Sequence, residues 1–113
     1  MADSCIFCRI ARGEVPAQML SHNKEMAAFR DLNPQAPVHI LIVPVKHITS
    51  LDDVNDFDLL GRMMALAAAI ARQEKVSKTG YRTVINTGKN GGQSVDHLHI
   101  HLLGGREMTW PPG

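Results

Sequence analysis

Histidine alternates with aliphatic residues over positions 97–102, which read His-Leu-His-Ile-His-Leu. Side chains point to opposite faces of a β-strand in turn, so this pattern predicts a strand with the three imidazoles on one face and the three aliphatic side chains on the other. The aliphatic face would pack on a core, and the imidazole face would line a site. A polar strand face or a weak metal patch is the alternative. The residues Gly91-Gly92-Gln93-Ser94 just before the triad favour a functional site.

The rest of the sequence predicts an α+β domain. A short helix is expected over residues 5–12, with Ser4 as its N-cap and Gly13 at its end. Apolar side chains at helical spacing predict a long helix over residues 56–74, capped by Asn55 or Asp56. The expected strands are residues 18–21, 26–30, 38–43 and 81–86 and the triad segment, the last two pairing antiparallel. This order predicts an antiparallel sheet with the helices on one face.

Length and charge limit the classes of partner. The 113 residues fit one domain over residues 1–113. The 12 basic and 11 acidic side chains nearly cancel, so no broad surface for DNA, RNA or an anionic membrane is expected. No apolar run approaches the roughly 20 residues of a membrane span, and the start Met-Ala-Asp-Ser lacks the features of a secretory signal. We therefore expect a cytoplasmic protein without a membrane partner.

The triad predicts chemistry at phosphorus. An unprotonated imidazole nitrogen attacks phosphorus well when the other ring nitrogen donates its proton to a fixed acceptor. His99 has a histidine on each side along the strand, so it is the expected nucleophile, and His97 and His101 would orient it or contact the phosphate. The loop 87–93 would offer backbone N–H groups to an anion, and a plain hairpin turn is the alternative for that loop.

Cys5 and Cys8 are the two cysteines of the chain, and two residues separate them. This spacing suits a pair of metal ligands or a redox pair. A structural disulfide is less expected in a reducing cytoplasm. A closed tetrahedral zinc site would need two further ligands.

Four segments together resemble the histidine triad (HIT) superfamily, in particular its nucleotide-binding branch. They are residues 29–31, 34–39, 91–105 and 110–113. The resemblance implies a five-stranded antiparallel sheet with one long and one short helix, and a homodimer in which two such sheets join. It also implies a hydrolase that binds purine nucleotides and cleaves the P–N bond of purine nucleoside 5′-phosphoramidates, as an adenosine 5′-monophosphoramidase does.

The resemblance implies roles for single residues. His99 matches the nucleophile that forms a nucleotidyl-histidine intermediate, His101 matches the triad histidine that contacts the phosphate, and His39 matches a supporting histidine on the neighbouring strand. Ser94 matches the residue near the leaving group. The remaining matches are phosphate contacts at Asn86, Gly92 and Gln93, a ribose contact at Asp31, a wall around the base at Ile6, Phe7, Ile10, Phe29 and Leu32, and a residue near the partner subunit's site at Trp110.

Some similar proteins hold zinc with a cysteine pair and two histidines, which match Cys5, Cys8, His47 and His97 here. Four protein ligands leave no open position for water, so the role of this zinc would be structural. Free thiols and a surface histidine are the alternative. Asp96 departs from the family pattern, where an aromatic residue is common, and strand alternation predicts that it faces away from the triad.

Two other functions remain open at this point. The same first chemical step would serve a dinucleoside polyphosphate hydrolase or a nucleotidyl transferase, which differ in the leaving group or the final acceptor. A zinc-bearing dimeric adaptor or nucleotide sensor is an alternative of another class. The features that would allow such a protein to contact partner proteins are the dimer surface and the terminal segment Trp110-Pro111-Pro112-Gly113.

Overall fold

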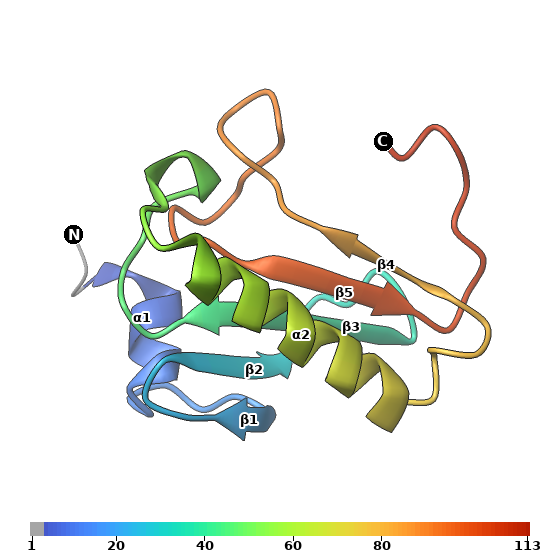
Figure 1. The fold of residues 1–113 in the computed structure, drawn as a ribbon, viewed down its shortest axis with the longest axis horizontal. Helices are drawn as coiled ribbons and strands as arrows, with labels where there is room; N and C mark the ends of the chain where they lie inside the picture. The colour runs from blue at the N-terminus through green and yellow to red at the C-terminus, as the bar shows by residue number, and fades with distance from the viewer. Residues whose placement is uncertain (1–3) are drawn as a thin grey trace.

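The computed structural model describes residues 4–113, which form a five-stranded sheet of order β1-β2-β3-β5-β4 with every neighbouring pair antiparallel (Figure 1). This confirms the expected sheet and the antiparallel pairing of its last two strands. The strands are β1 Met19–His22, β2 Met26–Arg30, β3 Val38–Pro44, β4 Tyr81–Val84 and β5 Ile100–Gly104. The helices are α1 Ile6–Ala11, the short 3-10 helix η2 Leu51–Asp53 and α2 Phe57–Gln73.

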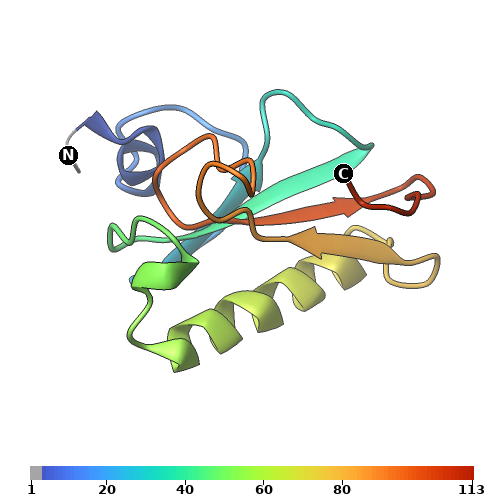
Figure 2. The same cartoon turned by 90° about the horizontal axis from the view of Figure 1, so that it is seen from above.

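The two α-helices cover opposite faces of the sheet, as Figure 2 shows. Helix α2 packs on the face that carries Ile40 and Ile42 of β3. Helix α1 packs on the other face, against Leu41 and Val43 of the same strand. The expectation that both helices lie on one face is therefore wrong. Strand β3 is apolar on both faces, and a strand of this kind needs cover on both sides.

Capping residues explain where the helices begin. Asp56 caps α2, because its carboxylate accepts the N–H groups of Asp58 and Leu59. Helix α1 is capped by Cys5 and not by Ser4 as predicted, since the N–H of Cys8 donates to Cys5 Sγ at 3.4 Å. No helix within residues 4–113 has both the length and the apolar character that crossing a bilayer requires.

The triad segment is only partly a strand. Strand β5 begins at Ile100, so His97 and His99 lie in the irregular segment that leads into it, and the predicted strand over all three histidines is wrong in its extent. The ladder to β3 ends at the pair Ile42–Ile100. The alternation of faces nevertheless holds in space, because Leu98, Ile100 and Leu102 are buried in the core beneath α2, whereas the His99 ring meets Phe7 of α1.

Gly104 at the end of β5 provides a test of core packing. A Cβ on this residue would lie 2.8 Å from the Cβ of Val76. We expect Gly104→Ala to lower the free energy of unfolding by about 1–3 kcal/mol, because the buried site has no room for a methyl group. The matched control is Gly61→Ala in α2, where no atom lies within 4 Å of the added Cβ. It should stabilise the protein by roughly 0.5–1 kcal/mol. Urea denaturation measures both, and equal effects would contradict the packing argument.

Candidate active site

A pocket of about 450 Å³ opens on the α1 face of the sheet. Its apolar wall contains all five side chains that were predicted to surround a base: Ile6, Phe7, Ile10, Phe29 and Leu32. Its polar lining contains five further predicted residues: Asp31, His39, Ser94, His99 and His101. Residues that were not predicted also line it, among them Val15, Pro16 and Ala17 between α1 and β1, and Asn33, Gln35, Leu41 and Val95. Gln35 and Val95 lie within the segments 34–39 and 91–105 that carry the resemblance, but the sequence predicted no role for any of these side chains, and folding brings them here.

His99 is held in one tautomer by the backbone. Its Nδ1–H donates to the carbonyl oxygen of His97 at 2.7 Å. In a neutral ring the proton is then on Nδ1, and Nε2 keeps a free lone pair. The ring is only 3% exposed and stacks edge-on against the rings of Phe7 and His101, with centroids 5.0 and 4.9 Å away. His99 therefore offers an unprotonated nitrogen in a fixed orientation within the pocket wall.

A chain of hydrogen bonds sets the tautomer of His101 as well. The N–H of Gln35 donates to His39 Nδ1 at 3.0 Å, so the neutral His39 ring carries its proton on Nε2. That Nε2–H donates to His101 Nδ1 at 2.9 Å, which leaves the proton of His101 on Nε2. Burial lowers the pKa of His101 to about 4, and burial also lowers the pKa of His39 although Asp31 opposes this. His101 thus presents an N–H donor at neutral pH.

The neutral state of His101 predicts loss of stability in acid. The unfolded side chain takes up a proton near pH 6.5, whereas the folded one does so only near pH 4. Its contribution to the free energy of unfolding is therefore complete above pH 6.5 and is lost as the pH falls toward 4. We expect His101→Gln to lose less stability than the wild type over this interval, in urea titrations at several pH values. If the free energy of unfolding falls equally with pH in the two proteins, the neutral state of folded His101 is contradicted.

Asp31 lies at the edge of the pocket beyond the end of β2. One carboxylate oxygen accepts the N–H of Asn33 at 2.8 Å. The other lies 3.4 Å from His39 Nε2. The neighbouring Leu32 is 89% exposed, so it stands at the mouth of the pocket rather than in the core. The half-buried carboxylate is available to a hydroxyl-bearing ligand that enters past Leu32.

The three predicted phosphate contacts outside the triad, Asn86, Gly92 and Gln93, are not among the residues that line this pocket, and their contact with a phosphate stays a prediction. The N–H groups of Gly92 and Gln93 donate to Lys89 and Gly88 carbonyls within the loop. The Asn86 amide donates to the Gly91 carbonyl at 2.7 Å. These polar groups hold the loop together. A Cβ at Gly91 would overlap the carbonyl of Thr87, so only glycine fits the tight turn.

The four predicted metal ligands meet in one cluster. Cys5 Sγ lies 3.2 Å from His97 Nδ1, and Cys8 Sγ lies 3.2 Å from His47 Nδ1 and 3.4 Å from His97 Nδ1. All four ligand atoms lie within 4.8 Å of one another. Tetrahedral zinc with Zn–S and Zn–N bonds of usual length requires about 3.5 Å between sulfur and nitrogen. The donor set and spacing therefore fit such an ion.

His97 is turned away from the pocket, against the expectation that its ring touches the phosphate or orients His99. The ring Nε2–H donates to the Pro44 carbonyl at 2.8 Å, and Nδ1 faces the two sulfurs. A hydrogen bond of this kind fixes the tautomer of a metal-ligating histidine. His97 serves His99 through its carbonyl oxygen instead of its ring. One residue thus joins the Cys/His cluster to the pocket.

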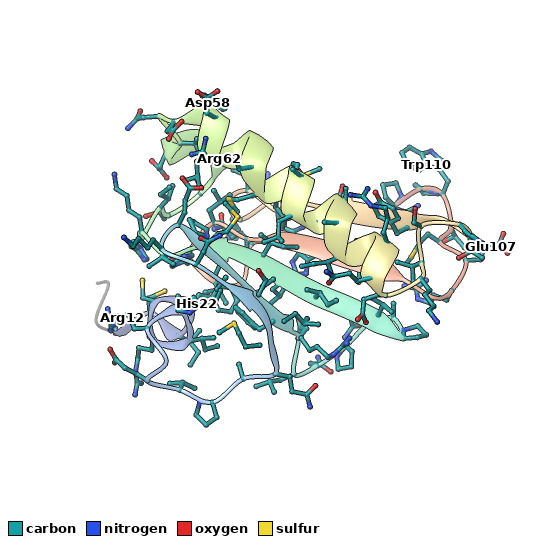
Figure 3. All side chains as sticks on the ribbon, turned by 60° about the horizontal axis from the view of Figure 1, so that its bottom comes forward. Arg12, His22, Asp58, Arg62, Glu107 and Trp110 are labelled. Carbon is teal, nitrogen blue, oxygen red and sulfur yellow. The ribbon has the colours of Figure 1, made fainter. Side chains whose placement is uncertain are left out.

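Asp96 and Trp110 lie outside the pocket. The segment around Asp96 is a bend, so strand alternation does not apply to it, and Asp96 lines a separate pocket together with Cys5 and His47. Trp110 is 82% exposed and stands at the opposite end of the molecule from Arg12 in Figure 3. Its predicted place near a partner subunit's site stays a prediction.

Comparison with known proteins places this geometry in a family. Residues 12–108 match the family described as the HIT domain. The chain belongs to the HIT family. The Escherichia coli K12 protein named purine nucleoside phosphoramidase is 46% identical over 110 residues, which are 96% of this chain and 92% of that protein. These findings show a HIT-family hydrolase.

Two solved structures of the HIT family are also similar. A HIT family hydrolase from Legionella pneumophila Philadelphia 1 is 53% identical with a TM-score of 0.94, over 97% of this chain and 100% of that one. A Zn-bound histidine triad family protein from Mycobacterium smegmatis is 29% identical with a TM-score of 0.82, over 94% of this chain and 78% of that one. The HIT fold predicted from the sequence is therefore confirmed.

Proposed function

We propose that this HIT hydrolase cleaves the P–N bond of purine nucleoside 5′-phosphoramidates through a nucleotidyl-histidine intermediate. The observation that carries the proposal is the bond from His99 Nδ1–H to the His97 carbonyl, which leaves a nucleophilic Nε2 in the pocket wall. The name of the Escherichia coli relative, purine nucleoside phosphoramidase, supports this substrate class. The same chemistry would also open a dinucleoside polyphosphate, so the assay below includes one.

The substrate would bind with its base against the apolar wall and its ribose on Asp31. Phe7 and Phe29 lie edge to face at a centroid distance of 5.6 Å and give this wall a flat aromatic character. The Asp31 oxygen near His39 would accept a ribose hydroxyl. The five side chains of the apolar wall, Ile6, Phe7, Ile10, Phe29 and Leu32, carry no hydrogen-bonding group that would separate adenine from guanine. Purine binding in general, rather than one base, is what the pocket supports.

The reaction would take place in two displacements at the α-phosphorus. His99 Nε2 forms a bond to phosphorus while the P–N bond breaks, and the amine leaves with a proton relayed through the Ser94 hydroxyl. The Nε2–H of His101 donates to a phosphate oxygen and stabilises its growing charge. Water then attacks phosphorus, the bond to His99 breaks, and the proton lost with the amine is replaced from that water. The products are the amine and the nucleoside monophosphate.

Zinc at Cys5, Cys8, His47 and His97 would be a structural part of this enzyme. Bound there, it would tie α1 to the segment that leads into β5, with all four positions filled by protein. The reaction itself needs no cofactor, since His99 supplies the nucleophile. The remaining proposals are a cytoplasmic homodimer formed by joining two sheets, and a single HIT domain over residues 1–113.

The decisive assay follows AMP release from adenosine 5′-phosphoramidate by ³¹P NMR, in parallel with a dinucleoside polyphosphate. We expect faster turnover of the phosphoramidate. In ¹⁸O-labelled water, multiple turnovers should place one labelled oxygen in each AMP. A radiolabelled substrate quenched in alkali should leave label on the wild-type protein, because phosphohistidine bonds resist base. No AMP from the phosphoramidate would overturn the proposal, and AMP from the polyphosphate alone would favour the other hydrolase.

A further inference from the structure

A second pocket of about 530 Å³ begins directly beyond Ser94. Ile6, Ser94 and Val95 line both this pocket and the pocket that contains His99, so the two cavities are neighbours with Ser94 at their boundary. Thr49 and Asp96 also line the second pocket. We call it the Asp96 pocket. Cys5 and His47 of the Cys/His cluster also border this pocket, whereas Thr49 and Asp96 belong neither to that cluster nor to the proposed reaction.

Asp96 is an unpaired negative charge in this pocket. Its side chain is exposed, and it makes no hydrogen bond or ion pair with any residue in the described range 4–113. No lysine or arginine from that range lines the Asp96 pocket. Among the described residues, His47 is the one basic side chain that shares the pocket with Asp96. A carboxylate beside a low-dielectric wall attracts a cation more strongly than a free carboxylate in water does.

The backbone that carries Asp96 is fixed on both sides. The Gln93 side-chain amide donates to the carbonyls of Thr49 and Val95, at 2.7 and 3.0 Å. On the other side, His97 is buried and bound to the Pro44 carbonyl. The carboxylate is therefore presented to the pocket at a set position, which reduces the entropy lost when a ligand binds.

We propose that the Asp96 pocket receives the leaving amine, and that Asp96 selects phosphoramidates whose leaving amine carries a second, positively charged group. Diamines and basic amino acids are amines of this class. This inference rests on the proposed function. The nucleoside fills the first pocket as far as His99, and an in-line displacement sends the leaving group to the opposite side of phosphorus. Because the Asp96 pocket adjoins the first pocket at Ser94, we place the leaving amine there. The bonds broken and formed are those of the reaction above.

The test compares three adenosine 5′-phosphoramidates of similar size. Their amines are 2-aminoethylamine, propylamine and β-alanine, which give the distal end a positive charge, no charge and a negative charge. At an ionic strength of ~20 mM, we expect kcat/KM to fall about three- to tenfold at each step from cation to neutral to anion. High salt should bring the three kcat/KM values closer together, because it screens the charges.

Variants assign the preference to one residue. Asp96→Asn should make the three kcat/KM values nearly equal, and Asp96→Lys should reverse their order. The matched control is Asp58→Asn, which removes an exposed carboxylate at the start of α2 (Figure 3) and should keep the wild-type order. Because the readout is a ratio between substrates of one protein sample, partial misfolding does not change it.

Three results would overturn the inference. The wild type could hydrolyse all three substrates at equal rates, or it could show a preference that Asp96→Asn keeps. In both cases the inference fails and the proposed phosphoramidase activity stands. If no phosphoramidate is hydrolysed at all, the proposed function fails and the inference fails with it.

Discussion

We expect His99→Ala to lower turnover of adenosine 5′-phosphoramidate by at least about 10⁴-fold, a change of about 5.5 kcal/mol in the activation free energy. The variant removes the nitrogen that would attack phosphorus, and the structure offers no second one in the same position. His101 Nδ1 is occupied by the proton of His39, and the ring of His97 faces the Cys/His cluster. Steady-state AMP release measures the effect.

Binding of the product should survive this change. The apolar wall and Asp31 are untouched by His99→Ala, so calorimetry should give an AMP affinity close to that of the wild type. The control His22→Ala removes an exposed histidine of β1 that does not line the pocket, and it should keep full turnover. In a His99→Gly variant, added imidazole should restore part of the activity. Near-normal turnover in His99→Ala would eliminate His99 as the nucleophile.

The second large effect concerns the Cys/His cluster. We expect wild-type protein to contain about one zinc per chain, and Cys8→Ser and His47→Ala to contain almost none. Their free energy of unfolding should fall by more than about 3 kcal/mol, because binding energy of a structural zinc is largely folding energy. Turnover should fall as well, since the His97 carbonyl that orients His99 belongs to a residue of this cluster. Elemental analysis and urea denaturation measure metal and stability separately from activity.

The matched control is again a histidine. His22→Ala changes the same residue type as His47→Ala outside the cluster, so it should keep both zinc and stability. Chelator treatment of the wild type should reproduce the stability loss of Cys8→Ser and should have no further effect on that variant. One zinc per chain in a Cys5→Ser/Cys8→Ser double variant would refute the ligand assignment.

Local patterns in the sequence predicted much of the sheet and of the pocket. The apolar run of residues 38–43 and the cap at Asp56 gave strand β3 and the start of α2. The same local reasoning failed at α1. Its N-cap is Cys5 and not Ser4, because the Cys5 sulfur accepts the N–H of Cys8. It also failed for the triad segment. The pairing of β5 with β3 ends at Ile100, although histidine and aliphatic residues already alternate from residue 97.

The sequence by itself determined that Leu98, Ile100 and Leu102 face the core and that α2 has one apolar side, because alternation and helical spacing are local properties of the backbone. With the family resemblance, it also supplied the set of chemical groups: three triad histidines, a cysteine pair and an acidic residue near the ribose. Only the tertiary structure decided what these groups do to one another. Cys5 and His97 are 92 positions apart. Contacts with Cys5, Cys8 and the Pro44 carbonyl turn the His97 ring away from the pocket and leave its own carbonyl to orient His99. Local rules contain no information about contacts of this range, so the tautomers of His99 and His101 and the neighbouring Asp96 pocket become visible only once the chain is folded.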